Sequence, residues 1–155
     1  MAQIARQPAP AIHVGLDQLV PLAAGLGLAA PAQAASADSA LGTWRTPSKN
    51  GTIEISRCGA SICGRLVSSD NLKKNPDLRD VNNKDEAKRT RKLKGLQIIG
   101  GFEKDGDKWE KGSIYNPEDG GTYKATISLD GPNTLKLKGC IVWPLCKTQT
   151  WTRID

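Results

Sequence analysis

The sequence predicts an all-β fold, an eight-stranded antiparallel up-and-down barrel with one long crossing loop. Two observations lead to this fold class. Short turns join runs in which apolar and polar side chains alternate with the period of a strand, and three pairs of these runs form hairpins that separate apolar from polar residues. An antiparallel meander of this length removes its exposed edges most easily by closing on itself.

Residues 1–34 have the features of a secretory signal. An apolar run rich in Ala, Gly and Pro ends in Ala32-Gln33-Ala34, an A-x-A cleavage site. The run contains two prolines and is shorter than the roughly 20 residues that cross a bilayer, so we expect no transmembrane helix. We expect a periplasmic or secreted protein with a cleaved signal peptide (1–34), a linker (35–41) and a single barrel domain (42–155).

The chain carries a formal net charge of +6. Such a charge permits contact with an anionic surface outside the cytoplasm, although it is common among small exported domains that bind none. The basic cluster at 88–94 has no interleaved aromatic residues and no nucleic-acid motif beside it. We therefore expect no nucleic-acid partner.

Four cysteines in an exported chain indicate two disulfides, for which three pairings are possible. Cys58 with Cys63, and Cys140 with Cys146, each lie between two strand-like runs, so we expect local disulfides at two hairpin tips. A four-cysteine zinc site is the alternative, although the spacings are wider than in most zinc pairs.

In the first hairpin we expect its two cysteines to face each other directly. That register sets Ile55 opposite Leu66 and Ile53 opposite Ser68 on the apolar face. In the last hairpin, direct pairing of the cysteines sets Leu137 opposite Gln149.

Residues 69–94 form the expected crossing loop, which is polar and charged, with one helical turn around 85–89. Structureless loops of this length are uncommon in compact domains and are often functional. Two interpretations stay open for this segment, a lid over a cavity mouth or a solvated excursion.

The stretch 112–123 predicts a further hairpin. Pro117 starts a four-residue turn, and Gly120 ends it in the left-handed conformation. This turn sets Ile114 opposite Tyr123. Strict alternation puts Trp109 on the outer face, so either a bulge at Gly112 turns it inward or it packs under the crossing loop.

The two ends of the barrel sequence resemble the closing pair of lipocalin-like proteins, in which a terminal arginine packs over a first-strand tryptophan. Gly42-x-Trp44 begins the first expected strand, and Trp151-Thr152-Arg153 ends the last. A partly desolvated guanidinium on an indole face is worth about 1 to 2 kcal/mol. We therefore expect Trp44 and Arg153 to become neighbours.

Residues 42–153 resemble more specifically the exported bacterial family catalogued as domain of unknown function 2147. The resemblance implies a lipocalin- or calycin-like barrel and an exported protein, and the family has no established activity. The crossing loop departs from the family pattern because it is longer and more basic, and the leader is atypical. The matching motifs are Gly42-x-Trp44, Cys58-Gly59 with Cys63-Gly64, Asp80-x-Asn82, Arg91-x-Leu93-x-Gly95-Leu96, Gly112-x-Ile114-Tyr115-Asn116-Pro117-x-Asp119-Gly120 with Tyr123, Leu135-x-Leu137-x-Gly139-Cys140, and Trp151-Thr152-Arg153.

We expect no enzyme activity, no cofactor and no metal. The single histidine, His13, lies in the expected leader, and its loss would remove imidazole-activated nucleophiles and histidine metal sites. Cysteines in disulfides supply no thiol. No pair of carboxylates has a spacing that predicts a shared pocket.

The leading functional hypothesis is a small apolar ligand bound in the barrel interior. An eight-stranded barrel is just wide enough either to fill with its own side chains or to hold one small ligand. Gly64 and Gly112 leave room at the wall, and the side chain of Gln149 offers a polar contact. The expected cavity-lining residues are Ile55, Leu66, Ile98, Tyr123, Ile127, Leu137, Gln149 and Trp151.

The alternative hypothesis is a non-enzymatic envelope interaction or structural module with a filled barrel. Such a module would use its basic loop and outer face to dock on a protein or an anionic surface. Taken singly, each expected lining residue is better explained as ordinary core, so the two hypotheses differ in whether the interior is hollow.

Overall fold

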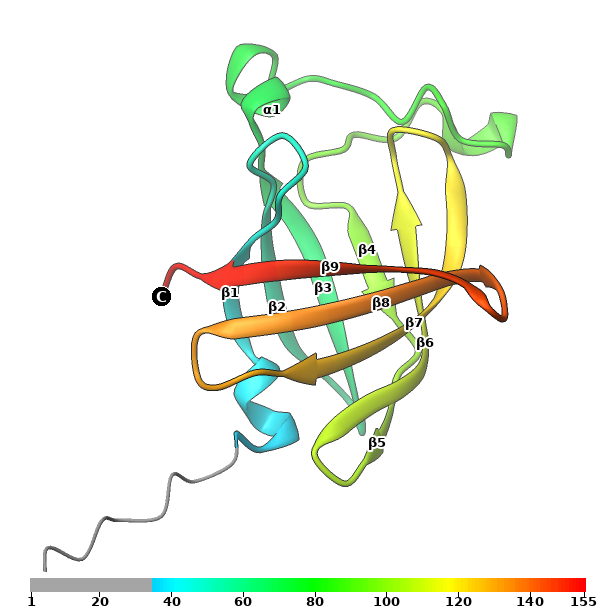
Figure 1. Cartoon of the computed structure of the whole chain (residues 1–155). Helices are drawn as coiled ribbons and strands as arrows, with labels where there is room; N and C mark the ends of the chain where they lie inside the picture. The colour runs from blue at the N-terminus through cyan, green and yellow to red at the C-terminus, as the bar shows by residue number, and fades with distance from the viewer. Residues whose placement is uncertain (1–34) are drawn as a thin grey trace, which may run out of the picture. The chain divides into compact units, whose positions relative to one another are not determined.

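A computed structural model describes residues 35–155 (Figure 1). The predicted signal peptide, 1–34, lies outside the described residues. Two 3₁₀ helices and one α-helix accompany the strands. The elements are η1 (Ala37–Ala40), β1 (Gly42–Arg45), β2 (Thr52–Cys58), β3 (Ser61–Ser68), α1 (Asp70–Lys74), η2 (Glu86–Lys88), β4 (Gln97–Gly100), β5 (Glu103–Asp105), β6 (Lys108–Asn116), β7 (Gly121–Leu129), β8 (Thr134–Val142) and β9 (Leu145–Arg153).

Eight antiparallel strands close into a barrel, which confirms the predicted fold class. Each strand pairs with the next along the chain except that β4 skips to β6, and β9 returns to pair with β1. The short strand β5 is an additional strand that pairs only with β6, at the edge of the barrel. The closed ring leaves no long strand edge open to another chain.

Closure brings the first and last strands together at Trp44 and Arg153, as predicted. The two residues are direct partners in the β1–β9 ladder, and the guanidinium carbon lies 4.2 Å from the centroid of the indole ring. The same guanidinium donates hydrogen bonds to the carbonyl oxygens of Leu41, at 2.9 Å, and Ser39. Its Nε donates to the carbonyl of Pro132 at 2.8 Å. One side chain thus joins β1, β9 and the segment before β1.

The segment before β1 is structured, which differs from the linker expected at 35–41. Ala37 and Ala40 of η1 are buried. Their carbonyl oxygens accept hydrogen bonds from the indoles of Trp109, at 2.7 Å, and Trp44, at 2.8 Å. A buried indole N–H needs an acceptor, and η1 supplies two of them at one end of the barrel, the lower end in Figure 1.

Trp109 points into the core because β6 carries a bulge. The register of the β6–β7 ladder shifts between Trp109 and Gly112, and Lys111 adopts a left-handed φ of 58°. This is the inward alternative considered for Trp109, whose side chain is fully buried. A third indole, Trp151, and the ring of Phe102 are also buried in the core.

The predicted registers of two hairpins are confirmed. Ile114 lies opposite Tyr123 across a turn that ends at Gly120, whose φ is 71°. In the last hairpin, Leu137 lies opposite Gln149. Both hairpins keep their apolar side chains on the inner face.

The predicted register of the first hairpin is wrong by two residues. Ile53, not Ile55, lies opposite Leu66, and Ile55 lies opposite Gly64. The turn contains only two residues, so Cys58 pairs with Ser61 in the ladder and reaches Cys63 on the diagonal. A shift of two residues keeps every side chain on its predicted face, and so the apolar pattern could not detect it.

Both expected disulfides are formed. Cys58 bonds to Cys63, and Cys140 bonds to Cys146. All cysteines of the described chain are therefore paired, and the four-cysteine zinc alternative is wrong.

The crossing segment, residues 69–96, runs over the end of the barrel opposite η1 (Figure 1). The helical turn expected around 85–89 is present as η2, and α1 is an additional short helix capped by the hydroxyl of Ser69. The helices described here are short, and none is long and apolar enough to cross a membrane.

Replacing Arg153 should weaken barrel closure. We expect Arg153→Ala to lower the free energy of unfolding by about 2 to 4 kcal/mol, through loss of the stacking and the carbonyl hydrogen bonds. Arg153→Lys should retain only part of this free energy, because lysine lacks the planar guanidinium with its several donors. Urea unfolding measures the effect, with Arg65→Ala as control, since Arg65 is exposed and donates to one carbonyl. Equal stability of the two alanine variants would contradict the closing role.

Reduction should destabilise the barrel. Each short disulfide loop contributes about 2 kcal/mol by constraining the unfolded chain. A reducing agent should therefore lower the melting temperature measured by scanning calorimetry. Unchanged melting, together with four titratable thiols in the native protein, would contradict the two disulfides.

Candidate functional site

A buried carboxylate fixes the crossing segment to the barrel wall. The side chain of Asp80 is fully buried and accepts three hydrogen bonds. The donors are Tyr115 Oη at 2.5 Å, Asn83 Nδ2 at 2.8 Å and Arg91 Nε at 2.8 Å. The guanidinium carbon of Arg91 also lies 5.3 Å from the centroid of the Tyr115 ring. We call these four residues the Asp80 cluster.

The hydrogen bonds of the cluster favour the ionised form of Asp80. Burial alone would raise the pKa of this carboxyl, but the hydrogen bonds from Tyr115, Asn83 and Arg91 outweigh it and hold the pKa below its usual value. Burial and the bond to Asp80 raise the pKa of Tyr115, so its hydroxyl keeps its proton and acts as a donor. Three donors therefore hold the ionised carboxylate, which makes it a structural anchor.

A second contact holds the segment to the β6–β7 turn. Asn82 Nδ2 donates to the carbonyl oxygens of Pro117 and Glu118, both at 3.1 Å. The backbone of Asn82 lies so close to Gly120 that a Cβ atom there would come within 1.9 Å of its carbonyl oxygen. Gly120 thus serves both the left-handed turn and this close approach, and any side chain there would push the segment away.

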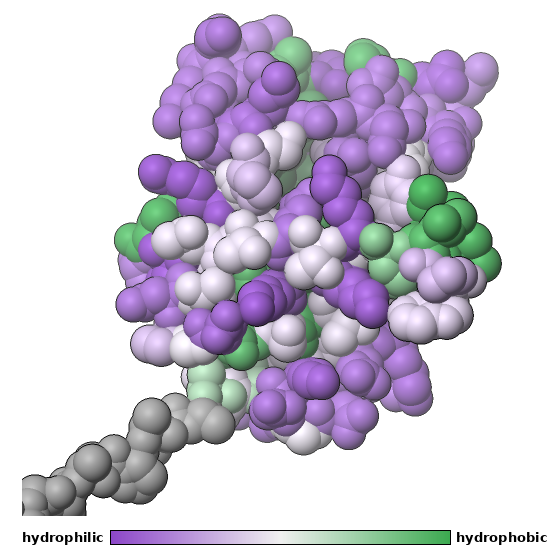
Figure 2. Space-filling view, viewed as in Figure 1, coloured by the Kyte–Doolittle hydropathy of each residue, from purple (hydrophilic) through white to green (hydrophobic). Residues whose placement is uncertain are grey.

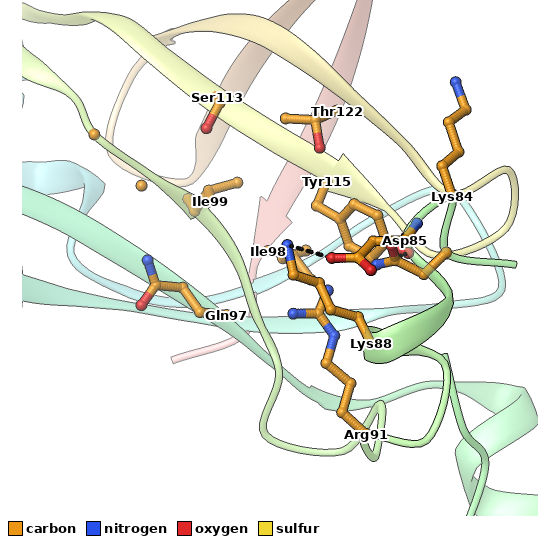
Figure 3. A pocket seen from close by; sticks show the side chains of 14 residues that line it. Lys84, Asp85, Lys88, Arg91, Gln97, Ile98, Ile99, Ser113, Tyr115 and Thr122 are labelled. Carbon is orange, nitrogen blue, oxygen red and sulfur yellow. Dashed lines mark hydrogen bonds and ion pairs between the residues drawn. The ribbon is translucent and has the colours of Figure 1, made fainter. Parts of the chain in front are cut away.

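An open pocket of about 670 Å³ lies between the crossing segment and the outer wall of the barrel (Figure 3). Its wall comes from β4, β6 and β7, with hydroxyls from Ser113 and Thr122 and a floor that includes Gly100 and Gly101. Its roof comes from the crossing segment. The lining residues are Asn83, Lys84, Asp85, Lys88, Arg91, Gln97, Ile98, Ile99, Gly100, Gly101, Ser113, Tyr115, Gly120 and Thr122.

The charged side chains of the pocket are mainly basic. Arg91 uses its Nε for Asp80, and its two terminal nitrogens have no hydrogen-bond partner among residues 35–155. Lys88 pairs with Asp85 at 3.4 Å, a surface ion pair that water screens. Figure 3 shows the side chains of Arg91, Lys88 and Asp85 converging beside Tyr115, whereas Lys84 points away from them at the rim. The arrangement offers cationic donors and hydroxyls to a polar ligand.

The structure distributes the sequence-predicted cavity residues over three environments. Five of them are buried in the core, namely Ile55, Ile98, Ile127, Leu137 and Trp151. Leu66, Tyr123 and Gln149 are half-buried. Ile98 is also the one member that lines the external pocket.

The wall positions expected to leave room inside the barrel are occupied. A Cβ atom on Gly64 would come within 2.4 Å of the Ile99 side chain, and one on Gly112 within 2.3 Å of the Phe102 ring. These glycines make space for neighbouring core side chains. The Gln149 side-chain oxygen, expected to meet a ligand, accepts a hydrogen bond from Trp151 Nε1 at 3.0 Å.

The residues that build the pocket could not be found as a site from the sequence. The matching motifs contain Asp80, Arg91 and Tyr115 at separate places in the chain, and their spacing does not indicate that they meet. Ser113 and Thr122 alternate outward on their strands, as surface residues do. The run of basic residues in the crossing segment was the one indication of a site in the sequence. Its position against β6 and β7 depends on long-range contacts, which the sequence pattern does not specify.

Comparisons with known proteins agree with the fold. A family model described as "Uncharacterized protein conserved in bacteria (DUF2147)" matches residues 42–153. A solved structure, protein HP1028 from Helicobacter pylori, described as belonging to the lipocalin family, is similar with a TM-score of 0.67 and 22% sequence identity, covering 74% of this chain and 82% of that chain. No curated protein matches this chain. At this identity the structural likeness shows a lipocalin-like fold.

Asp80→Asn should destabilise the protein at neutral pH by about 2 to 3 kcal/mol, because three donors lose their ionised acceptor. The folded-state pKa of Asp80 is lowered, so its stabilisation is present above the unfolded pKa of about 3.9 and is lost as the pH falls through the folded value. Urea unfolding at a series of pH values should show the gap to wild type shrinking below about pH 4.

Asp77→Asn is the matched control. Asp77 belongs to the same segment and pairs with Lys92, but its side chain is 73% exposed, so its replacement should have little effect. A gap for Asp80→Asn that stays constant into strong acid would contradict the anchoring role of the carboxylate.

Proposed function

The chain belongs to the DUF2147 family of uncharacterized bacterial proteins, and we propose that it is an exported, non-catalytic protein that binds a small anionic ligand in the pocket under its crossing segment. The lipocalin-like fold suggests small-ligand binding in general. We infer the position and the charge of the ligand from the residues that line the site.

The observation that carries the proposal is the anchored Arg91. Asp80 orients the guanidinium through Nε and leaves its terminal nitrogens toward the pocket, and Tyr115 packs against its plane. A guanidinium fixed in this way loses little conformational entropy when it binds a carboxylate or phosphate. Lys88 lies beside it and can exchange its exposed partner Asp85 for a ligand anion.

The pocket favours a polar ligand over the apolar one expected from the sequence. Hydroxyls of Ser113 and Thr122 and the amide of Gln97 can hydrogen-bond to such a ligand. Ile98 and the Tyr115 ring give one apolar surface, which suits a small organic anion with a short carbon skeleton. An apolar ligand in the barrel interior stays a prediction, and the filled positions beside Gly64 and Gly112 weigh against it.

Export and the absence of catalysis are parts of the same proposal. Two disulfides fit a protein that folds in an oxidising compartment. The buried carboxylate of Asp80, near the pocket, is held by three donors and so is poorly suited to exchange protons with a ligand.

Thermal-shift and calorimetric titration with citrate, glycerol 3-phosphate and inorganic phosphate test the proposal. We expect at least one of these anions to stabilise the protein, by about 2.7 kcal/mol at a hundredfold excess over its Kd. Lys88→Glu should weaken that binding about tenfold or more, because it replaces a cation with a repelling charge.

Lys73→Glu is the matched control, because Lys73 forms the same kind of exposed i, i+3 ion pair, with Asp70, away from the pocket. Native mass spectrometry of gently purified protein then identifies any ligand that stays bound. Binding of apolar ligands only, unchanged in Lys88→Glu, would overturn the external site and support the interior.

A further inference from the structure

The tip of the β8–β9 hairpin exposes large apolar side chains. Ile141, Val142, Trp143 and Leu145 are 74%, 59%, 75% and 64% exposed, within five consecutive residues that also include Pro144. Figure 2 shows this end of the hairpin as a hydrophobic patch at the right edge of a largely hydrophilic face. We call residues 141–145 the apolar tip. Contiguous exposed apolar residues usually mark an interaction site.

The apolar tip projects beyond the barrel and is held rigid. The last β7–β8 ladder pair joins Lys124 to Cys140, so the tip continues past the end of the β7–β8 ladder. The disulfide between Cys140 and Cys146 crosses the base of the tip, where the two cysteines are direct ladder partners. A rigid hairpin presents its side chains without an added cost in conformational entropy.

The strand ends that carry the tip are basic. Lys138 and Lys147 lie within two residues of the Cys140–Cys146 pair, and no acidic residue occurs between 131 and 154. The ammonium of Lys138 lies 4.7 Å from the centroid of the Trp143 ring. An indole and its neighbouring lysines at the edge of an apolar surface are the combination that anchors proteins at the headgroup level of a bilayer.

We propose that the apolar tip inserts into the surface of an anionic lipid bilayer, with the lysines of the hairpin on the headgroups. A second copy of this chain is a poorer partner, because self-pairing would bring the same cationic hairpins together. The tip also has five residues, far fewer than the roughly 20 a side that form a standard protein interface. Each lysine near an anionic surface strengthens binding electrostatically. The apolar side chains add a contribution to the binding free energy that salt does not screen.

Vesicle sedimentation tests the proposal with the full disulfide-bonded barrel. We expect binding to vesicles of equal parts phosphatidylglycerol and phosphatidylcholine, and little binding to phosphatidylcholine alone. Trp143→Ser should lower the partition coefficient about tenfold or more, and Lys138→Gln about fivefold. Val81→Ser is the matched control, because Val81 is 63% exposed in the crossing segment and should leave binding unchanged.

Tryptophan fluorescence gives a second readout. Trp143 is exposed, whereas Trp44, Trp109 and Trp151 are at most 1% exposed, so quenching by brominated lipid reports on the tip. We expect quenching in wild type and its loss in the double variant Val142→Ser, Leu145→Ser, which retains Trp143. Absence of binding to the anionic vesicles, or binding unchanged in Trp143→Ser, would overturn the proposal. The proposal would also be overturned if the protein did not bind vesicles but formed a dimer that Trp143→Ser dissociates. That result would assign the tip to contact with a second copy of the chain.

Discussion

Closure of the barrel depends on a short ladder reinforced by a single side chain. β1 and β9 pair only at Trp44 with Arg153 and at Arg45 with Thr152. The Arg153 guanidinium strengthens this seam because it covers the Trp44 indole and binds carbonyls on both sides of it. The indole in turn donates to Ala40 of η1. Without the seam, the meander would expose two strand edges and an aromatic core.

The same closure fills the interior of the barrel, and the pocket described above lies outside it. Three indoles and the surrounding aliphatic side chains fill the interior, and the small wall residues accommodate Ile99 and Phe102. The crossing segment adds little to this core beyond Leu96 because most of its side chains are polar, and it packs against the outer wall through Asp80. Burying a carboxylate is favourable only when donors surround it, so the anchor also fixes Arg91 at the pocket.

Local patterns predicted the parts of the fold that depend on local chemistry. The turn at Pro117 and Gly120 and the direct pairing of Cys140 with Cys146 fix two registers. The predicted register of the first hairpin differs from the observed one by two residues. A diagonal disulfide and a direct one put the same side chains on the inner face, so the apolar pattern does not distinguish them. The pocket was missed because Asp80, Arg91 and Tyr115 meet only after the crossing segment folds back, and nothing in their spacing specifies that contact.

A crystal structure of the protein with its co-purified or titrated ligand would show where the ligand binds. The proposed external site requires ligand density outside the barrel, against the terminal nitrogens of Arg91 and the ammonium of Lys88, with the Asp80 cluster unchanged. Density inside the barrel, beside Tyr123 and Gln149 and remote from Arg91, would contradict it.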